Sequence, residues 1–254
     1  MPAANQPTRT SRGGSRLLLP ALVLPVLLAL LSWTASYFFN VFNSDVTMPD
    51  WTVDLTLTAA EILSALRSAV LPALVACSAY AGEKTGTVLL TAGAGIVSNL
   101  LFGLVSTWLS EGFGLLNPLT LLTDLVLCAA AFLIGKAVRR RAERAKNLRE
   151  RKKWGMRKAA VFAALPAAIL PTAYALMDLT DHLGHRSAYS AEVFAAGTAH
   201  FTGILVRRLL IYGVLGAFAA YLAASLAVRL LRRGKAEKPG GDPNAAGATG
   251  ASGA

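Results

Sequence analysis

Long apolar stretches separated by shorter polar ones dominate this sequence. The apolar runs cover about 17–39, 59–80, 87–109, 118–134, 159–176 and 209–228. Because about 20 apolar residues in a helix cross the hydrocarbon of a bilayer, we expect each run to be a transmembrane helix. The pattern therefore predicts an all-α, polytopic membrane bundle of six transmembrane helices, with the domain extending over 17–233.

The first run admits two interpretations, because a polar, basic tail (1–16) precedes it, as in a cleavable signal peptide. The run is longer than the apolar core of 7 to 15 residues typical of signal peptides. It also ends in Tyr37, Phe38 and Phe39, and aromatic residues are enriched where helices leave the membrane. We expect an uncleaved first span.

The segment before the second run alternates between apolar and polar residues over 51–58. Such a period of two predicts an extended, strand-like piece, although one strand has no partner in view. Thr58 and Glu61 have the spacing of a capping box, in which the two side chains satisfy free amides at a helix start. We expect the second helix to begin there.

A basic block between the fourth and fifth runs sets the orientation. Residues 136–158 contain twelve Lys or Arg and two Glu. A short loop rich in Lys and Arg stays in the cytoplasm, so six crossings place both termini there, including the polar, disordered tail 234–254. The fourth helix should continue into this block, which has good helix formers and no Pro.

Composition agrees with a membrane protein of the plasma (inner) membrane, and abundant Ala, Leu and Gly suit a bacterium. The chain is 54% hydrophobic and only 15% charged, against about a quarter charged in soluble domains. Its net charge of +11 does not indicate nucleic acid, because 20 of the 25 Lys and Arg lie in the segments assigned to the cytoplasm. Cys77 and Cys128 form no metal or redox motif, and we expect no cofactor.

Arg67 and Asp124 are charged residues well inside the predicted spans. Arg67 and Asp124 each follow the outer end of a span by a few residues, so they should lie at similar depth and within reach of each other. An ionisable residue in a membrane tends to face the bundle interior and find a partner. The pair is either a structural ion pair or part of a substrate or ion pathway.

Prolines and glycines suggest local features of the helices. Pro72 and Pro166 are candidates for helix kinks, and the similar sequences around them allow a weak hypothesis of two inverted repeats. Five glycines in the third and sixth runs are expected to permit close packing of helices. They are Gly93, Gly95, Gly103, Gly213 and Gly216.

The outer segments collect every His of the chain. Asp181, His182 and His185 form a DHxxH pattern that suits a transition metal, but no spacing supplies a third firm ligand. We therefore expect solvated loop residues. Ser190 is a candidate cap for a helix starting at Ala191. A continuous helix from there to Arg233 is too long for one span, so 191–206 should lie on the outer surface or re-enter the membrane.

Known catalytic patterns are absent from the sequence. It contains no phosphate-binding GxxxxGK[ST], no HExxH and no GxSxG. We expect a non-enzymatic transport protein, either a small permease or the substrate-recognising membrane subunit of a transporter. The alternatives are an assembly or scaffold protein of the cell envelope and, least favoured, an intramembrane enzyme acting on lipid-linked substrate at the outer face. Loop 136–158 is expected to anchor the topology or to contact anionic lipid or a cytosolic or membrane partner.

Overall fold

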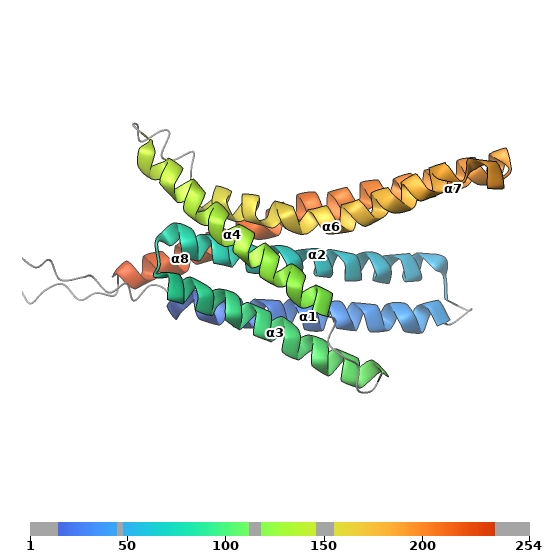
Figure 1. Cartoon of the computed structure of the whole chain (residues 1–254). Helices are drawn as coiled ribbons and strands as arrows, with labels where there is room; N and C mark the ends of the chain where they lie inside the picture. Colours follow the sequence, from blue (N-terminus) through green and yellow to red (C-terminus); the bar gives the residue numbers. More distant parts are fainter. Residues whose placement is uncertain (1–14, 45–47, 112–117, 146–154, 237–254) are drawn as a thin grey trace, which may run out of the picture.

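The fold is a bundle of long helices, seen in a computed structural model that describes residues 15–44, 48–111, 118–145 and 155–236 (Figure 1). The α-helices are α1 (Ser15–Ser44), α2 (Asp50–Ala81), α3 (Thr85–Glu111), α4 (Pro118–Arg144), α6 (Met156–Gly184), α7 (Ala191–Arg208) and α8 (Gly216–Ala236). A 3-10 turn, η1 (Arg186–Ala188), precedes α7, and a π-helical segment, η2 (Leu209–Leu215), joins α7 to α8.

The helices run back and forth between two ends of the bundle. The start of α1, the turn between α2 and α3, the end of α4 and the end of α8 lie at one end, and we call this the basic end because Lys136, Arg139, Arg140, Arg144 and Arg157 gather there (Figure 1). The connections from α1 to α2 and from α6 to α7 lie at the other end, the hairpin end. The expected all-helical bundle is confirmed.

Among the described residues, five helical stretches are long and apolar enough to cross a membrane. They are Leu17–Ser44, Asp50–Ala81, Leu121–Arg144, Met156–Gly184 and Ala191–Leu231. The remaining predicted span corresponds to α3, in which the described apolar stretch, Thr85–Leu101, is shorter. Five of the six predicted runs thus fall within helices of sufficient length.

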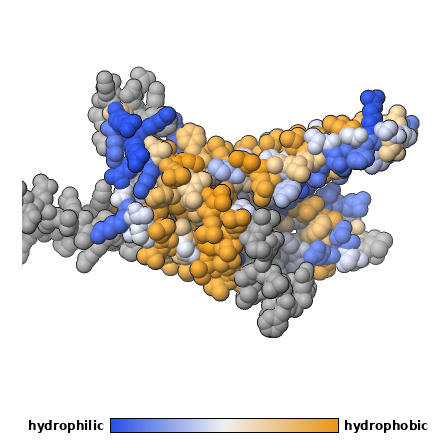
Figure 2. Space-filling view, in the orientation of Figure 1, coloured by the Kyte–Doolittle hydropathy of each residue, from blue (hydrophilic) through white to orange (hydrophobic). Residues whose placement is uncertain are grey.

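An apolar surface surrounds the middle of the bundle. Large side chains that a soluble protein would bury are exposed, among them Leu89, Leu133 and Ile169, each more than 60% exposed. Figure 2 shows the apolar band, with hydrophilic residues at the basic end and on the projecting α6–α7 hairpin. Because soluble monomers rarely expose apolar patches of this extent, the band indicates a protein embedded in a membrane.

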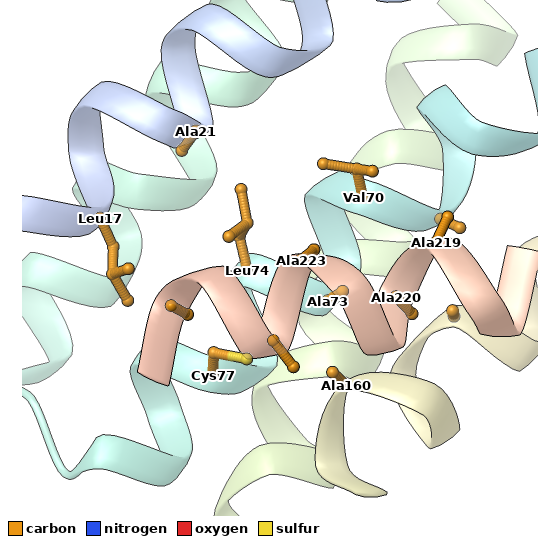
Figure 3. Packing of buried hydrophobic residues seen from close by; sticks show 14 residues of the cluster. Leu17, Ala21, Val70, Ala73, Leu74, Cys77, Ala160, Ala219, Ala220 and Ala223 are labelled. Atoms are coloured by element: carbon orange, nitrogen blue, oxygen red, sulfur yellow. The ribbon is translucent and has the colours of Figure 1, made fainter. Parts of the chain in front are cut away.

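Helix α2 lies at the centre and contacts α1, α3, α4, α6 and α8. Alanines at every fourth position, Ala65, Ala69 and Ala73, are buried along it. Similarly spaced alanines in α6 and α8 pack with it around Leu74 and Cys77, as Figure 3 shows. Small residues at this spacing let helix backbones approach closely, which is the main source of helix association within lipid.

The region 51–58 is helical, so the predicted extended piece is wrong. Helix α2 begins at Asp50, after Pro49, and the predicted start at Thr58 is wrong as well. The threonines adapt to the helix, because the Thr56 hydroxyl donates to the Thr52 carbonyl at 3.0 Å. The alternating pattern was misleading because a lone strand has no neighbour with which to pair its backbone groups, whereas a helix pairs them internally.

Glycine packing follows the predictions only in part. A Cβ at Gly95 would lie 2.1 Å from the Leu71 side chain, and one at Gly216 would contact Ala69 at 3.6 Å. Gly93 and Gly213 face open space, so close packing is wrong for these two, and the side chain positions around Gly103 lie outside the described residues. The tightest backbone approach is at Gly135 of α4, where a Cβ would lie 2.6 Å from the Ala76 carbonyl oxygen.

The chain from Ala191 to Ala236 is one continuous helical path through α7, η2 and α8, and Ser190 caps α7 as predicted. Helix α7 packs against the second half of α6, so these two helices form a hairpin that projects beyond the apolar band (Figures 1 and 2). The helix from Ala191 is thus unbroken and longer than one span needs, and its first part, α7, lies in this hairpin.

Several predicted boundaries fall beyond the structure. The tails 1–14 and 237–254 and the middle of the basic block, 146–154, lie outside the described residues. The rest of the block is helical, as expected for its first part, because α4 continues to Arg144 and α6 starts at Met156.

The contact at Gly135 yields a stability prediction. Gly135→Ala forces a methyl group against a backbone oxygen that no side-chain rotation can move, and such overpacking costs about 1–3 kcal/mol. Gly93→Ala, the matched control, meets no atom within 4 Å and should be neutral or slightly stabilising, because Ala favours helix. Thermal unfolding in detergent followed by circular dichroism measures the difference; equal melting temperatures for both variants would contradict this packing.

Candidate functional site

Three polar side chains from three helices meet inside the apolar band. They are Arg67 of α2, Asn99 of α3 and Asp124 of α4, and we call them the polar cluster. The Asn99 amide nitrogen donates to Asp124 Oδ2 at 3.0 Å, and Arg67 interacts with the Asp124 carboxylate through charge. All three side chains are partly buried.

The packing of the neighbouring turns explains why these residues meet. Leu71, one turn after Arg67, packs onto Gly95, one turn before Asn99. Because α2 and α3 are antiparallel, this contact brings Arg67 and Asn99 to one level, and the hydrogen bond places Asp124 there too. Gly95 has no side chain, so the two helices approach closely beside the cluster.

Not every hydrogen-bonding group of the polar cluster has a partner. Among the described residues, Arg67 makes no hydrogen bond to Asp124. The hydrogen bond to the Asp124 carboxylate comes from Asn99 and joins α3 to α4. Asn99 Oδ1 is buried and accepts no hydrogen bond. A buried polar atom of this kind costs about 1–3 kcal/mol, so the arrangement carries an unfilled acceptor beside a carboxylate and a guanidinium.

Asn99 was missed by sequence reasoning, which considered only ionisable residues within the spans. Its signal is modest: it is an amide in an otherwise uncharged run, and membrane helices use such side chains for interhelical hydrogen bonds. That Asn99 lies level with Arg67 depends on the register of α2 against α3, which the turn at Gly82, with φ of 78°, sets. The sequence alone does not give this register.

A second polar contact lies toward the hairpin end. Arg207 of α7 donates from Nη2 to Glu61 Oε1 of α2 at 3.0 Å, and the neighbouring Arg208 donates to the Pro171 carbonyl of α6 at 3.2 Å. Glu61 was expected to cap α2, but it lies eleven residues inside that helix and pairs with a distant residue. The contact joins α2 to the base of the α6–α7 hairpin.

A third polar group closes the turn at the basic end. The Ser78 hydroxyl donates to the Glu83 carboxylate, and Arg139 pairs with Glu143 at 2.7 Å. Burial raises the pKa of the Glu83 carboxyl, and the Ser78 hydrogen bond acts in the opposite direction. A side chain at Gly82 would collide with the Arg139 guanidinium, so this turn and α4 are fitted together.

The outer histidines do not converge on a metal site. His182 is 8% exposed, lies among the rings of Tyr189, Phe194 and Phe201, and its Nε2 is 3.1 Å from the Phe194 carbonyl. The expectation of a solvated loop residue is therefore wrong for His182, which holds the tip of the α6–α7 hairpin together. His185 is exposed and contacts Asp181 of its own turn.

No group of three metal-binding side chains occurs in the described parts of the chain. The two prolines proposed as kink sites, Pro72 and Pro166, both lie inside helices, α2 and α6, which continue past them. The two cysteines belong to different hydrophobic clusters. Cys77 packs in the cluster around α8, and Cys128 packs in the cluster around α3 and α4. The polar cluster remains the best candidate for a functional site.

Reversing the two charges tests whether the cluster acts as a unit. Arg67→Asp places two carboxylates together, and Asp124→Arg places two guanidinium groups together, so each change alone should lower thermal stability. Charged groups within lipid cost about 2.5–3.5 kcal/mol when uncompensated. The double variant should recover part of the loss, measured as a double-mutant cycle of melting temperatures; strictly additive losses would show that the two charges do not interact.

A scan against protein-family models matched none, and searches of curated proteins and of solved structures found no match, so the site must be interpreted from its own geometry.

Proposed function

We propose that this chain is an integral protein of the bacterial inner membrane that serves transport, as a small permease or as the substrate-recognising membrane subunit of a transporter. The observation that carries the proposal is the polar cluster, in which Arg67, Asn99 and Asp124 meet within an apolar band. Ionisable residues within a membrane are costly and characteristically mark substrate or ion pathways.

The unfilled acceptor of Asn99 favours a binding role over a purely structural one. A structural clip is stabilising when its donors and acceptors are paired, and bundles are most stable when buried polar networks are fully satisfied. Here a guanidinium, a carboxylate and a free amide oxygen lie together, and a small polar solute could bind to all three. Lacking a nucleotide-binding motif, the protein would use an ion gradient or energy from a partner ATPase.

Charge sorting supports a topology with six crossings and both termini in the cytoplasm. Arg139, Arg140 and Arg157 lie at the basic end, and Asp50, Asp178 and Glu192 belong to the hairpin-end segments. Positive charge is retained on the cytoplasmic side during insertion. The basic end would then lie against anionic lipid headgroups or a cytosolic or membrane partner.

Reporter fusions test the topology. An alkaline phosphatase fused after Ser44 or after Gly184 should be active, because that enzyme folds only outside the cytoplasm. A green fluorescent protein fused at either terminus should fluoresce, because it matures in the cytoplasm. Active phosphatase at one terminus would exclude the proposed number of crossings.

Solute flux tests the transport proposal directly. Proteoliposomes loaded with a mixture of small metabolites and inorganic ions, analysed by mass spectrometry after dilution, should release at least one solute faster than empty liposomes. Asp124→Asn, which keeps the shape but removes the charge, should reduce that rate at least tenfold. Asp178→Asn is the matched control and should leave it unchanged, because Asp178 lies in the hairpin beyond the apolar band. Equal release from protein-containing and empty liposomes, with and without an imposed ion gradient, would count against a permease.

A scaffold protein of the cell envelope is the second candidate, and the projecting α6–α7 hairpin favours it. Met177 of α6 and Val193 of α7 are exposed, and Figure 2 shows hydrophilic residues on the projecting hairpin. A scaffold should retain a specific membrane partner through detergent extraction when the hairpin is intact and lose it when the hairpin tip is replaced. Substitutions in the polar cluster should leave that association unchanged, whereas they abolish transport.

A further inference from the structure

The junction of α2 with the base of the α6–α7 hairpin contains an ion pair that is only half made. Arg207 Nη2 contacts Glu61 Oε1 at 3.0 Å, whereas Arg207 Nε and Glu61 Oε2 are both buried and have no partner. Nε and Nη2 are adjacent donors on one edge of the guanidinium, the pair that normally grips both oxygens of a carboxylate. The observed contact uses one bond of a possible two.

This ion pair lies between the outer surface and the polar cluster. Glu61 and Arg67 belong to the same helix, and six residues place Glu61 about 9 Å farther toward the hairpin end. The two side chains of the pair are 18% (Glu61) and 36% (Arg207) exposed, so the contact lies at the boundary between buried and open regions. A solute moving from the hairpin end toward Arg67 and Asp124 along α2 would meet this contact first.

A π-helical segment begins directly after the two arginines. Residues Leu209–Leu215 form η2, which contacts α2, α6 and α8. π-helical turns contain an extra residue with poorer hydrogen-bond geometry, and they frequently occur at functional sites and at bends. Gly213, within the segment, meets no atom within 4 Å of the position of a Cβ, so this turn has room to change shape.

Separate contacts hold the two sides of this segment. Before it, Arg207 and Arg208 attach α7 to Glu61 and to the Pro171 carbonyl. After it, α8 is held by its buried alanines against α2 and α6. No residue of α7 is fully buried, and α7 is held by its packing against the second half of α6, so the hairpin can move relative to the fixed α8 only as a unit, after the arginine contacts exchange.

We propose that Glu61 and Arg207 form a latch that closes the outer end of the route to the polar cluster, with η2 as the hinge on which the α6–α7 hairpin moves. The inference rests on the proposed function for the meaning of the route, whereas the latch and hinge stand on the geometry alone. A second hydrogen bond, from Arg207 Nε to Glu61 Oε2, would strengthen the closed latch. When the latch opens, both charged groups become hydrated.

The native thiol of Cys128 can be used to measure the opening of the latch. Cys128 lies one turn after Asp124 on α4 and is 6% exposed, so a closed latch should keep water from it and an open latch should admit water to it. With Cys77→Ala, it is the single thiol of the chain. In spheroplasts, a membrane-impermeant, charged methanethiosulfonate reagent added outside modifies Cys128 at a rate that measures this opening.

The latch variants should increase that rate. In the Cys77→Ala background, we expect Glu61→Gln and Arg207→Gln each to accelerate modification of Cys128 at least tenfold. The exchange of charges, Glu61→Arg with Arg207→Glu, should return the rate toward that of the parent. Arg139→Gln is the control, because it breaks an ion pair within α4, Arg139 with Glu143, at the basic end, far from the latch, and should leave the rate unchanged.

Milder variants guard against unfolding. Arg207→Lys keeps the charge but removes the paired Nε and Nη2 donors. It should give a rate of Cys128 modification between those of the parent and Arg207→Gln, with an unchanged gel-filtration profile. Rates within twofold of the parent for every latch variant, or equal acceleration by Arg139→Gln, would overturn the latch. If the latch variants open Cys128 while the wild-type protein moves no solute, the latch stands and the transport proposal fails.

Discussion

The close approach of α2 to its neighbours is the interaction on which the rest of the structure depends. In lipid, burying a leucine gains little, because the surrounding chains are equally apolar, so association relies on fit. Ala65, Ala69 and Ala73 bring the backbone of α2 close to its neighbours, and Gly135 brings α4 against the Ala76 carbonyl. Larger side chains at these positions would separate the helices and also the polar groups between them.

The polar cluster is a consequence of that register. The fit of Leu71 onto Gly95 fixes the level at which Arg67 and Asn99 meet, and the approach of α4 places Asp124 within reach of the Asn99 amide. The same argument applies farther out, where α2 carries Glu61 to Arg207. One central helix thus positions a carboxylate toward the hairpin end and a guanidinium nearer the middle of the bundle, and both interact with opposite charges from other helices.

The sequence predicted the apolar helices well and their extensions poorly. Runs of about 20 apolar residues predict helices because the backbone in lipid must satisfy its own hydrogen bonds. Outside the apolar band, that constraint disappears, and local patterns compete: Trp51 to Thr58 alternates as a strand would, yet forms the first turns of helix α2. The depth of Arg67 and Asp124 could be inferred from run lengths, whereas Asn99 and Arg207 required the register between helices, which no local pattern contains.

The surplus helix length has a functional consequence. The path Ala191–Leu231 covers 41 residues, about 62 Å at 1.5 Å per residue, against about 30 Å of hydrocarbon. Strong tilt does not accommodate it, because α8 is held nearly alongside α2 by its alanines. The excess lies in α7, and the π-helical segment marks where the packed part of this path gives way to the projecting part. A rigid projection that shares its helix with the bundle core can transmit a contact made outside to the charged groups within, and this coupling would serve a permease and a scaffold alike.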